Sequence, residues 1–361
     1  MGANVCRTPT LRDVARMAGV SMSTVSRSLN QSDLIPEKTR ARIRRIADQI
    51  GFEFNSHARS LITRKVGTIG LILPPGYESF GVSFYHATLH NALRSVLESN
   101  DFDLIVSFLA NRFTGDNNMR RLVRRRKVDG LIIMQPVFEK DMIDFLRSMS
   151  MPFVFSHYPP PQDILPGIDI IYPDNELGGW LAGRHFAERG RKKILCVTPG
   201  HGSPLHPDGP PPDAEFSLRL AGFRRGLGES GIRLAREDLL TGALTMNSAY
   251  DAVMARRQGL ARYDGLFALN DLMAMGAMLA LRDLGRRVPQ DVAVIGYDDT
   301  DLAESMRPSL TTVHQPREEL SLVTCEHLLE LIRLSRGAGA PPSAQSIVLA
   351  PRLIVRESSS G

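Results

Sequence analysis

The chain has 361 residues, of which 43% are hydrophobic and 23% are charged, so we expect about two or three domains, each able to bury a core. No apolar run reaches the ~18 residues of a membrane-spanning helix, and the charged N-terminus lacks the apolar stretch of a signal peptide, so we expect a cytoplasmic protein. The three cysteines are far apart in the sequence, which predicts neither a disulfide framework nor a zinc site.

Positive charge is concentrated at the N-terminal end of the chain. The whole chain has a formal charge of +5, but residues 1–65 contain twelve Lys and Arg against five Asp and Glu. The rest of the chain is close to neutral. A basic segment joined to a near-neutral body is typical of nucleic-acid-binding proteins, and an ordinary solvated surface is the alternative.

Three short helices are predicted near the N-terminus. The first covers residues 11–18 and ends at Gly19, which favours a left-handed turn. The second begins after Ser21, a good N-cap residue, and continues to about residue 29. The third covers residues 36–50 and begins with a proline, which suits the first helical position.

The segment from Thr10 to Asn30 has the spacing of a helix-turn-helix. Ala15 is small enough for two helices to cross closely there, and Gly19 permits the sharp turn between them. The second helix would place its N-terminal end in the major groove, where Arg27 can bridge O6 and N7 of a guanine. A generic helical hairpin is the alternative. The DNA contacts predicted in this segment are Thr10, Ser21, Met22, Ser23, Thr24, Ser26, Arg27 and Asn30.

From Val66 onward, short apolar runs alternate with longer amphipathic segments. This pattern is typical of parallel sheets covered on both faces, and its length favours two α/β units over a single sheet. Two last short strands are expected around residues 347–355. The other expected strands are 68–73, 103–108, 130–134, 153–155, 168–172, 194–197, 266–269 and 292–297, and the expected helices are 84–99, 139–148, 175–188, 217–230, 247–258, 271–284 and 317–335.

An ordered series of motifs extends through nearly the whole chain. Examples are Asn55-Ser-His-Ala-Arg-Ser-Leu61 and Val294-Ile-Gly-Tyr-Asp-Asp299. In order and spacing, the series resembles the LacI/GalR family of bacterial transcription regulators. The motifs that carry this resemblance are residues 10–30, 39–43, 51–52, 55–61, 66–74, 219–223, 268–271, 288–289, 294–299, 308–312 and 352–358.

The resemblance implies a small all-α helix-turn-helix headpiece and an α/β core. The core would have two lobes of the periplasmic-binding-protein type, with parallel sheets and helices on both faces. The implied domains are a DNA-binding headpiece at 1–54, a hinge helix and linker at 55–65, and a core at 66–361, with an N-terminal lobe of about 66–173 and 316–344 and a C-terminal lobe of about 174–315 and 345–361.

The resemblance also assigns a role to the segment between headpiece and core. Residues 58–61 would form a short hinge helix in the minor groove. Leu61 would be the apolar wedge between base steps, and Ala58 would allow the close approach beside Arg59. Without the resemblance, the same segment is equally compatible with a basic linker.

The resemblance further implies a ligand site between the two lobes. A carboxylate, an amide and a guanidinium around an aromatic surface favour a sugar or a sugar-like ligand. Several of these residues have a simpler alternative role. The aromatic pair could belong to the core, Asn270 and Asp298 could cap helices or turns, and Arg219 could pair with a surface acid. The implied contacts are Phe84, Tyr85, Asp174, Arg219, Asn270, Asp298 and Gln315.

We therefore expect a transcription regulator, most simply a repressor, that acts as a homodimer or tetramer. Its partners would be a pseudo-palindromic operator and a small, carbohydrate-like effector, without a cofactor, metal or membrane. The alternative is a solute-binding protein of a transport system, which shares the two lobes but has no use for the basic N-terminal segment. No catalytic motif suggests an enzyme, and Gly226–Gly231 matches G-x-G-x-x-G at the end of a helix, which argues against dinucleotide binding.

A strongly basic run, Arg120–Lys127, precedes an expected strand in the body of the protein. The sequence favours a solvated helix face there over a second contact with DNA.

Overall fold

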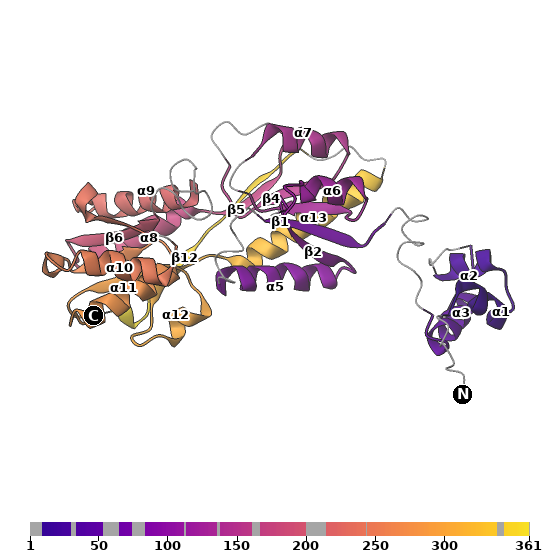
Figure 1. Cartoon of the computed structure of the whole chain (residues 1–361), viewed down its shortest axis with the longest axis horizontal. Helices are drawn as coiled ribbons and strands as arrows, with labels where there is room; N and C mark the ends of the chain where they lie inside the picture. Colours follow the sequence, from indigo (N-terminus) through magenta and orange to yellow (C-terminus); the bar gives the residue numbers. More distant parts are fainter. Residues whose placement is uncertain are drawn as a thin grey trace. The chain divides into compact units, whose positions relative to one another are not determined.

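The computed structural model describes residues 9–29, 34–52, 65–73, 84–111, 113–135, 138–160, 167–199, 214–242, 244–337 and 343–360 (Figure 1). Side chains of residues 84–87 lie outside this description. The chain divides into two compact units, Met1–Gly67 and Thr68–Gly361, which we call the headpiece and the core. None of the helices in the described ranges is long and apolar enough to span a membrane.

The headpiece consists of α1 (Leu11–Ala18), α2 (Met22–Leu29) and α3 (Glu37–Gln49), close to the predicted bounds. Gly19 ends α1 with a φ of +63°, a conformation that glycine adopts without steric cost. Apolar side chains from all three helices form one small core, as the spacing predicts. Its buried members are Val14, Ala15, Ala18, Val25, Ile43 and Ala47.

The core alternates strands and helices along the chain. Its strands are β1 (Thr68–Leu73), β2 (Asp103–Phe108), β3 (Gly130–Ile133), β4 (Phe153–Ser156), β5 (Ile170–Pro173), β6 (Ile194–Pro199), β7 (Leu239–Gly242), β8 (Gly265–Ala268), β9 (Ala293–Asp298), β10 (Thr311–His314), β11 (Ser346–Leu349) and β12 (Arg352–Ile354). Its helices are α5 (Phe84–Glu98), α6 (Asn118–Arg124), α7 (Lys140–Ser148), α8 (Asn175–Glu188), α9 (Ala214–Gly228), α10 (Met246–Ala255), α11 (Asp271–Asp283), α12 (Asp301–Ser305) and α13 (Arg317–Arg336), with short 3₁₀ helices at Arg236–Asp238, Leu260–Arg262 and Glu357–Ser359.

The first sheet has the strand order β11-β5-β4-β3-β1-β2, and all neighbouring strands are parallel. On one face, α5 and α13 pack against the strands through residues such as Leu93 and Leu328. On the other face, α6 and α7 contribute Leu122 and Ile143. Coverage of both faces explains why β1 is an uninterrupted apolar run.

The second sheet has the strand order β12-β10-β9-β8-β6-β7 and is parallel except for β12, which pairs antiparallel with β10. The sequence does not predict β7 or β10. Strand β7 is short and partly exposed, so it lacks an apolar run. Strand β10 contains buried Thr311 and Thr312, whose hydroxyl groups form hydrogen bonds inside the protein.

The predicted lobe for residues 345–361 is partly wrong. Strand β11 pairs with β5 in the first sheet. At one end of this pairing, the Ile170 backbone N–H donates to the Gln345 carbonyl oxygen at 2.9 Å. At the other end, the Asp174 backbone N–H donates to the Leu349 carbonyl oxygen, also at 2.9 Å. The chain joins the second sheet only at β12. An apolar pattern identifies two short strands here, but it contains no information on which sheet each strand joins.

Candidate DNA-binding and ligand-binding sites

The N-terminal end of α2 is polar and exposed. The Thr24 backbone N–H donates to Ser21 Oγ at 3.1 Å, so Ser21 caps the helix. The hydroxyl groups of Ser23 and Thr24 lie 2.7 and 2.8 Å from the same oxygen. Met22 is 46% exposed, and Arg27 is exposed one turn further along the helix. A helix N-terminus with these side chains can contact phosphates and base edges.

Hydrogen bonds within the headpiece stabilise both ends of α1. Arg42 of α3 donates from Nη2 to the Ala18 carbonyl oxygen at 2.7 Å and so satisfies the C-terminal end of α1. The Thr10 backbone N–H and hydroxyl donate to the Asp13 carboxylate at 3.0 and 2.6 Å. Thr10, a predicted DNA contact, therefore has a structural role at the start of α1.

In the core, a buried arginine connects the ends of several elements. Arg219 of α9 is 3% exposed. Its Nε donates to Asn175 Oδ1 at 2.8 Å, and its Nη1 donates to the Leu269 carbonyl oxygen at 2.7 Å. The guanidinium carbon lies 3.8 Å from the ring centroid of Tyr297, a cation–π distance. Asp298 Oδ1 lies 3.5 Å from Arg219 Nη1 and supplies the opposite charge.

Asp298 ends β9 beside Arg219. Its φ of +112° is rare for a residue with a side chain, and such backbone conformations often occur at functional sites. Gln315 donates from Nε2 to Asp298 Oδ1 at 2.7 Å. Arg317 donates from Nη1 to the Asp298 carbonyl oxygen at 3.0 Å. The N-cap of α12 is Thr300, so Asp298 does not cap this helix. Through the contacts above, the three predicted residues Arg219, Asp298 and Gln315 form one cluster.

The other two described contacts, Asn270 and Asp174, cap helices. Asn270 Oδ1 accepts from the Met273 backbone N–H at 2.8 Å, and Asp174 Oδ1 accepts from the Leu177 backbone N–H at 2.9 Å. Each directly adjoins a residue that accepts a hydrogen bond from Arg219. The capping role predicted as an alternative for Asn270 is confirmed, and its position keeps it beside the cluster.

Glycines in α8 and α9 let these two helices approach closely enough to place Arg219. A Cβ atom on Gly179 would lie 1.9 Å from the Arg219 carbonyl oxygen, and one on Gly222 would lie 1.8 Å from the Glu176 carbonyl oxygen. Gly226, the first residue of the G-x-G-x-x-G match, also contacts the α8 backbone. This glycine therefore allows the close packing of α8 against α9.

A second carboxylate, Asp271, lies fully buried near Asp298. Thr300 donates to Asp271 Oδ2 from its backbone N–H at 2.7 Å and from its hydroxyl at 3.0 Å, and Thr312 donates to Oδ1 at 2.6 Å. Burial, followed by the charge of Asp298, raises the pKa of Asp271 to about 7. Burial also raises the pKa of Asp298 to about 6, opposed by Arg219. Strongly perturbed carboxyl groups are frequent at functional sites.

The sequence alone does not assign His157, Asn175 or Tyr297 to the site. His157 follows β4 in the first sheet and is 5% exposed. Burial, and then the positive charge of Arg219, lowers the pKa of His157 to about 3, so the imidazole is neutral. Asn175 and Tyr297 each adjoin a predicted residue at a strand end, which is the signal that could have identified them.

The remaining predicted contacts lie outside what the structure describes. Phe84 and Tyr85 begin α5, but their side chains are not described. Four predicted DNA contacts, Asn30, Ala58, Arg59 and Leu61, and the proline-rich loop at 200–212 fall in ranges that are not described.

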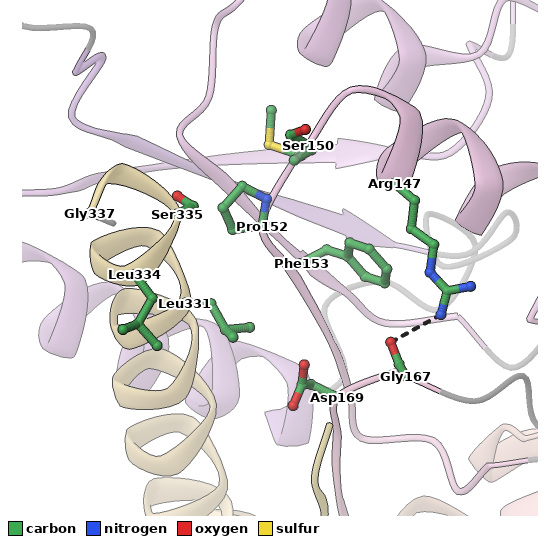
Figure 2. A pocket seen from close by; sticks show the side chains of 11 residues that line it. Arg147, Ser150, Pro152, Phe153, Gly167, Asp169, Leu331, Leu334, Ser335 and Gly337 are labelled. Atoms are coloured by element: carbon green, nitrogen blue, oxygen red, sulfur yellow. Dashed lines mark hydrogen bonds between the residues drawn. The ribbon is translucent and has the colours of Figure 1, made fainter. Parts of the chain in front are cut away.

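A cavity of about 410 Å³ lies between the start of β4 and the C-terminal part of α13 (Figure 2). It is lined by Phe153 at the start of β4, Asp169 just before β5, and Leu331 in α13. Figure 2 shows Arg147 donating to the Gly167 carbonyl oxygen, at 3.1 Å, on one side of it. None of the residues in the Arg219 cluster lines this cavity. No group of acidic, His and Cys side chains within the described ranges could hold a metal ion.

The fold and sites define a helix-turn-helix protein with a two-lobed α/β core. Residues 10–55 match the family "Bacterial regulatory proteins, lacI family", and residues 184–359 match the "Periplasmic binding protein-like domain". The repressor PurR of Photobacterium profundum is 30% identical over 90% of this chain and 92% of its own length. The ribose operon repressor of Escherichia coli is 30% identical over 90% of this chain and 93% of its own.

Two solved structures extend the likeness to the fold. The lac repressor dimer bound to operator and the anti-inducer ONPF aligns with a TM-score of 0.78, at 25% identity, over 98% of this chain and 99% of that one. The regulator CelR in complex with cellobiose aligns with a TM-score of 0.68, at 27% identity, over 97% and 100%. The chain belongs to the lacI family of bacterial regulatory proteins. It is therefore a transcription regulator, not an enzyme or a transport protein.

Proposed function

We propose that this protein represses transcription by binding a two-fold-related operator as a dimer, and that a sugar-like ligand at the Arg219 cluster changes its operator affinity. Its similarity to the ribose operon repressor, to CelR with cellobiose and to the lac repressor dimer on operator supports each part of this proposal. The single observation that carries the ligand part is the buried guanidinium of Arg219, fixed beside Asp298.

For DNA, the proposal assigns base-edge contacts to the exposed end of α2 and phosphate contacts to its N-terminal hydroxyl and N–H groups. Residues 1–54 would form the DNA-binding domain, and residues 55–65 the hinge. The assigned contacts are Thr10, Ser21, Met22, Ser23, Thr24, Ser26, Arg27, Asn30, Ala58, Arg59 and Leu61.

For the ligand, the proposal uses the chemistry of the strand ends. Arg219 offers only donors, Asp298 offers acceptors, and the Gln315 amide offers both, so together they can hydrogen-bond the hydroxyl groups of a sugar ring. Buried polar groups at a site of this kind discriminate strongly against molecules that leave them unpaired. The assigned contacts are Phe84, Tyr85, Asp174, Arg219, Asn270, Asp298 and Gln315.

Coupling between ligand and DNA would follow from linkage. The chain passes between the two sheets three times, after β5, after β10 and after β11. A ligand that contacts both lobes would favour one arrangement of them, and the lobes would transmit this preference to the paired hinge segments. The ligand and the operator must then change each other's affinity by the same factor.

The test compares two arginines of α9. A panel of sugars that includes ribose and cellobiose is first tested for an effect on the operator affinity of the wild type. Arg219→Gln should abolish this effect. Its operator affinity without sugar should stay within about 3-fold of the wild type, which is a change of less than about 1.4 kcal/mol. Arg225→Gln is the matched control, since Arg225 pairs on the surface with Glu176 at 2.8 Å. A normal sugar response in Arg219→Gln would remove Arg219 from the site.

A further inference from the structure

A cluster of positive charge lies on the core, outside both sites described above. Residues 117–128 contain six Lys and Arg and no Asp or Glu. Arg124, Arg125, Arg126 and Lys127 are all exposed, at the end of α6 and in the turn that follows it. We call these four residues the basic turn.

The two arginines that precede the basic turn have partners within the protein. Arg120 donates to the Asp141 carbonyl oxygen at 3.1 Å and lies 4.5 Å from the ring centroid of Phe145. Arg121 donates to Asn118 Oδ1 at 3.1 Å.

By contrast, the described parts of the chain offer the side chains of the basic turn no ion pair or hydrogen bond. Arg124 has only a longer ring contact, 5.6 Å from the Phe145 centroid. The nearest acidic residue after the turn, Asp129, is paired with Arg336 at 2.8 Å. Within the described residues, the charge of the basic turn is therefore not neutralised by an acidic partner.

The basic turn directly precedes β3, whose N-terminal end lies beside the N-terminal end of β1 in the first sheet. The Asp129 backbone N–H donates to the Thr68 carbonyl oxygen at 2.8 Å, and Ile69 pairs with Gly130 in the parallel ladder of β1 and β3. Thr68 begins the core directly after Gly67, the last residue of the headpiece unit. The residues of the basic turn are thus two to five positions in sequence before Asp129, which is hydrogen-bonded to the first residue of the core.

The turn contains a residue in the left-handed backbone conformation. Arg126 has a φ of +50°, and it follows α6 at the position where helices most often have glycine. Lys127 N–H donates to the Leu122 carbonyl oxygen at 3.0 Å, which closes the helix. A residue with a side chain is less stable than glycine in this conformation, so glycine would suit the backbone at this position better than arginine.

We propose that the basic turn binds the phosphate backbone of DNA that flanks the operator. The inference rests on operator binding by the headpiece, and it adds a second, sequence-independent contact made by the core. Arginine and lysine side chains free of acidic partners are suited to phosphate oxygens, and they carry no base specificity without a groove-reading element. Each protomer of a dimer would supply one basic turn to one flank.

The first experiment measures how DNA affinity depends on salt. Full-length wild-type protein selects an operator from a random duplex library. Affinity is then measured against salt on a duplex of about 20 bp, which holds two half-sites one helical turn apart, and on a duplex about twice as long. Arg125→Gln/Arg126→Gln/Lys127→Gln should reduce the slope of log affinity against log salt by about 5 on the long duplex, because the dimer loses six phosphate contacts and each lost contact removes about 0.9. The short duplex should show little change.

A matched triple variant controls for net charge. Arg233→Gln/Arg236→Gln/Arg257→Gln removes three exposed arginines from the lobe of the second sheet and should leave both slopes unchanged. An equal fall in slope for both triple variants, or no fall for the basic turn, would overturn the inference. Failure to select any operator would instead count against the proposed function itself.

A single substitution separates DNA binding from helix stability. Arg126→Gly removes one charge from each protomer and relieves the backbone conformation, so it should melt at or above the wild-type temperature while its salt slope on the long duplex falls by about 2. Ser150→Gly relieves a similar φ of +50° without a charge change and should keep the wild-type slope. If Arg126→Gly keeps the full slope, the Arg126 side chain does not contact DNA phosphates, and the inference is wrong.

Discussion

Arg219 of α9 and Asp298 at the end of β9 form an ion pair with almost no access to solvent, with 3.5 Å between Nη1 and Oδ1 and exposed fractions of 4% and 14%. The pair joins a helix to the end of a strand, and removing either charge would leave the other buried without this partner. A ligand at this position must join or replace hydrogen bonds that already exist. The following predictions depend on this cluster or on the exposed end of α2.

The carboxyl pair makes stability depend on pH. The folded pKa of Asp271 is raised to about 7 and that of Asp298 to about 6, so the folded state holds protons that the unfolded chain has released above about pH 4. The contribution of these two groups to stability therefore falls as the pH rises from about 4 to about 7, by at most about 1.4 kcal/mol per unit for each carboxyl group. Asp271→Asn should gain stability relative to the wild type between pH 5 and pH 7, measured by urea unfolding.

The control for this prediction is Asp291→Asn. In the wild type, hydrogen bonds from Arg287 lower the pKa of Asp291. The Asp291 carboxyl group is therefore ionised above pH 5 in both the folded and the unfolded protein. The stability difference of Asp291→Asn from the wild type should stay constant between pH 5 and pH 7. A constant difference for Asp271→Asn as well would show that Asp271 is ionised throughout this range.

Close approach of α8 and α9 should limit substitution at Gly222. A Cβ atom there would lie 1.8 Å from the Glu176 carbonyl oxygen, so Gly222→Ala must push the helices apart. We expect a loss of about 1–3 kcal/mol in the free energy of unfolding, together with weaker ligand binding because Arg219 moves with α9. Gly228→Ala, on the same helix with nothing within 4 Å of the new atom, should change stability by less than about 0.5 kcal/mol. Equal stability of the two variants would disprove the packing argument.

Ser21 should have separable effects on headpiece stability and on DNA binding. Ser21→Ala removes the acceptor for the Thr24 N–H and should cost about 1 kcal/mol of headpiece stability. Ser21→Asp restores a good cap but places a negative charge where phosphate is expected, so it should melt like the wild type and bind operator more weakly. Thermal melting and fluorescence anisotropy measure the two effects. If Ser21→Asp binds operator normally, α2 does not approach phosphate at this end.

Arg27 should contribute sequence discrimination. Its side chain is exposed on the face of α2 proposed to enter the major groove. Arg27→Ala should lose about 1–3 kcal/mol of preference at one base pair of each half-site, while its affinity for random duplex changes little. Competition binding with single-base variants of the selected operator measures this preference. An unchanged profile would assign base reading to other residues.

Much of the fold follows from local patterns in the sequence. Continuous apolar runs such as Thr68–Leu73 form buried parallel strands, and Gly19 and Ser21 mark helix ends through their backbone chemistry. Elements without such a pattern are missed, among them β10, whose two buried threonines look polar in sequence. The assignment of β11 to the first sheet also depends on long-range pairing that no local pattern records.

The site was predictable in part. The resemblance predicts Arg219, Asp298 and Gln315, and these three form one cluster, joined by an ion pair between Arg219 and Asp298 and a hydrogen bond from Gln315 to Asp298. His157 was not assigned to it, because its influence on the site arises only when strands distant in sequence bring it near the charge of Arg219. Tyr297 was missed because a tyrosine in an apolar strand is most simply a core residue, and its stacking on a guanidinium is visible only in three dimensions.

The most direct test of the central claim is the affinity of the full-length wild-type protein for its selected operator and for a scrambled duplex of the same length, at moderate salt, with and without the sugar that the panel identifies. We predict that the operator binds at least about 10³-fold more tightly than the scrambled duplex, as is usual for specific regulators, and that the sugar changes this ratio. Equal affinity for the two duplexes in both conditions would contradict the account.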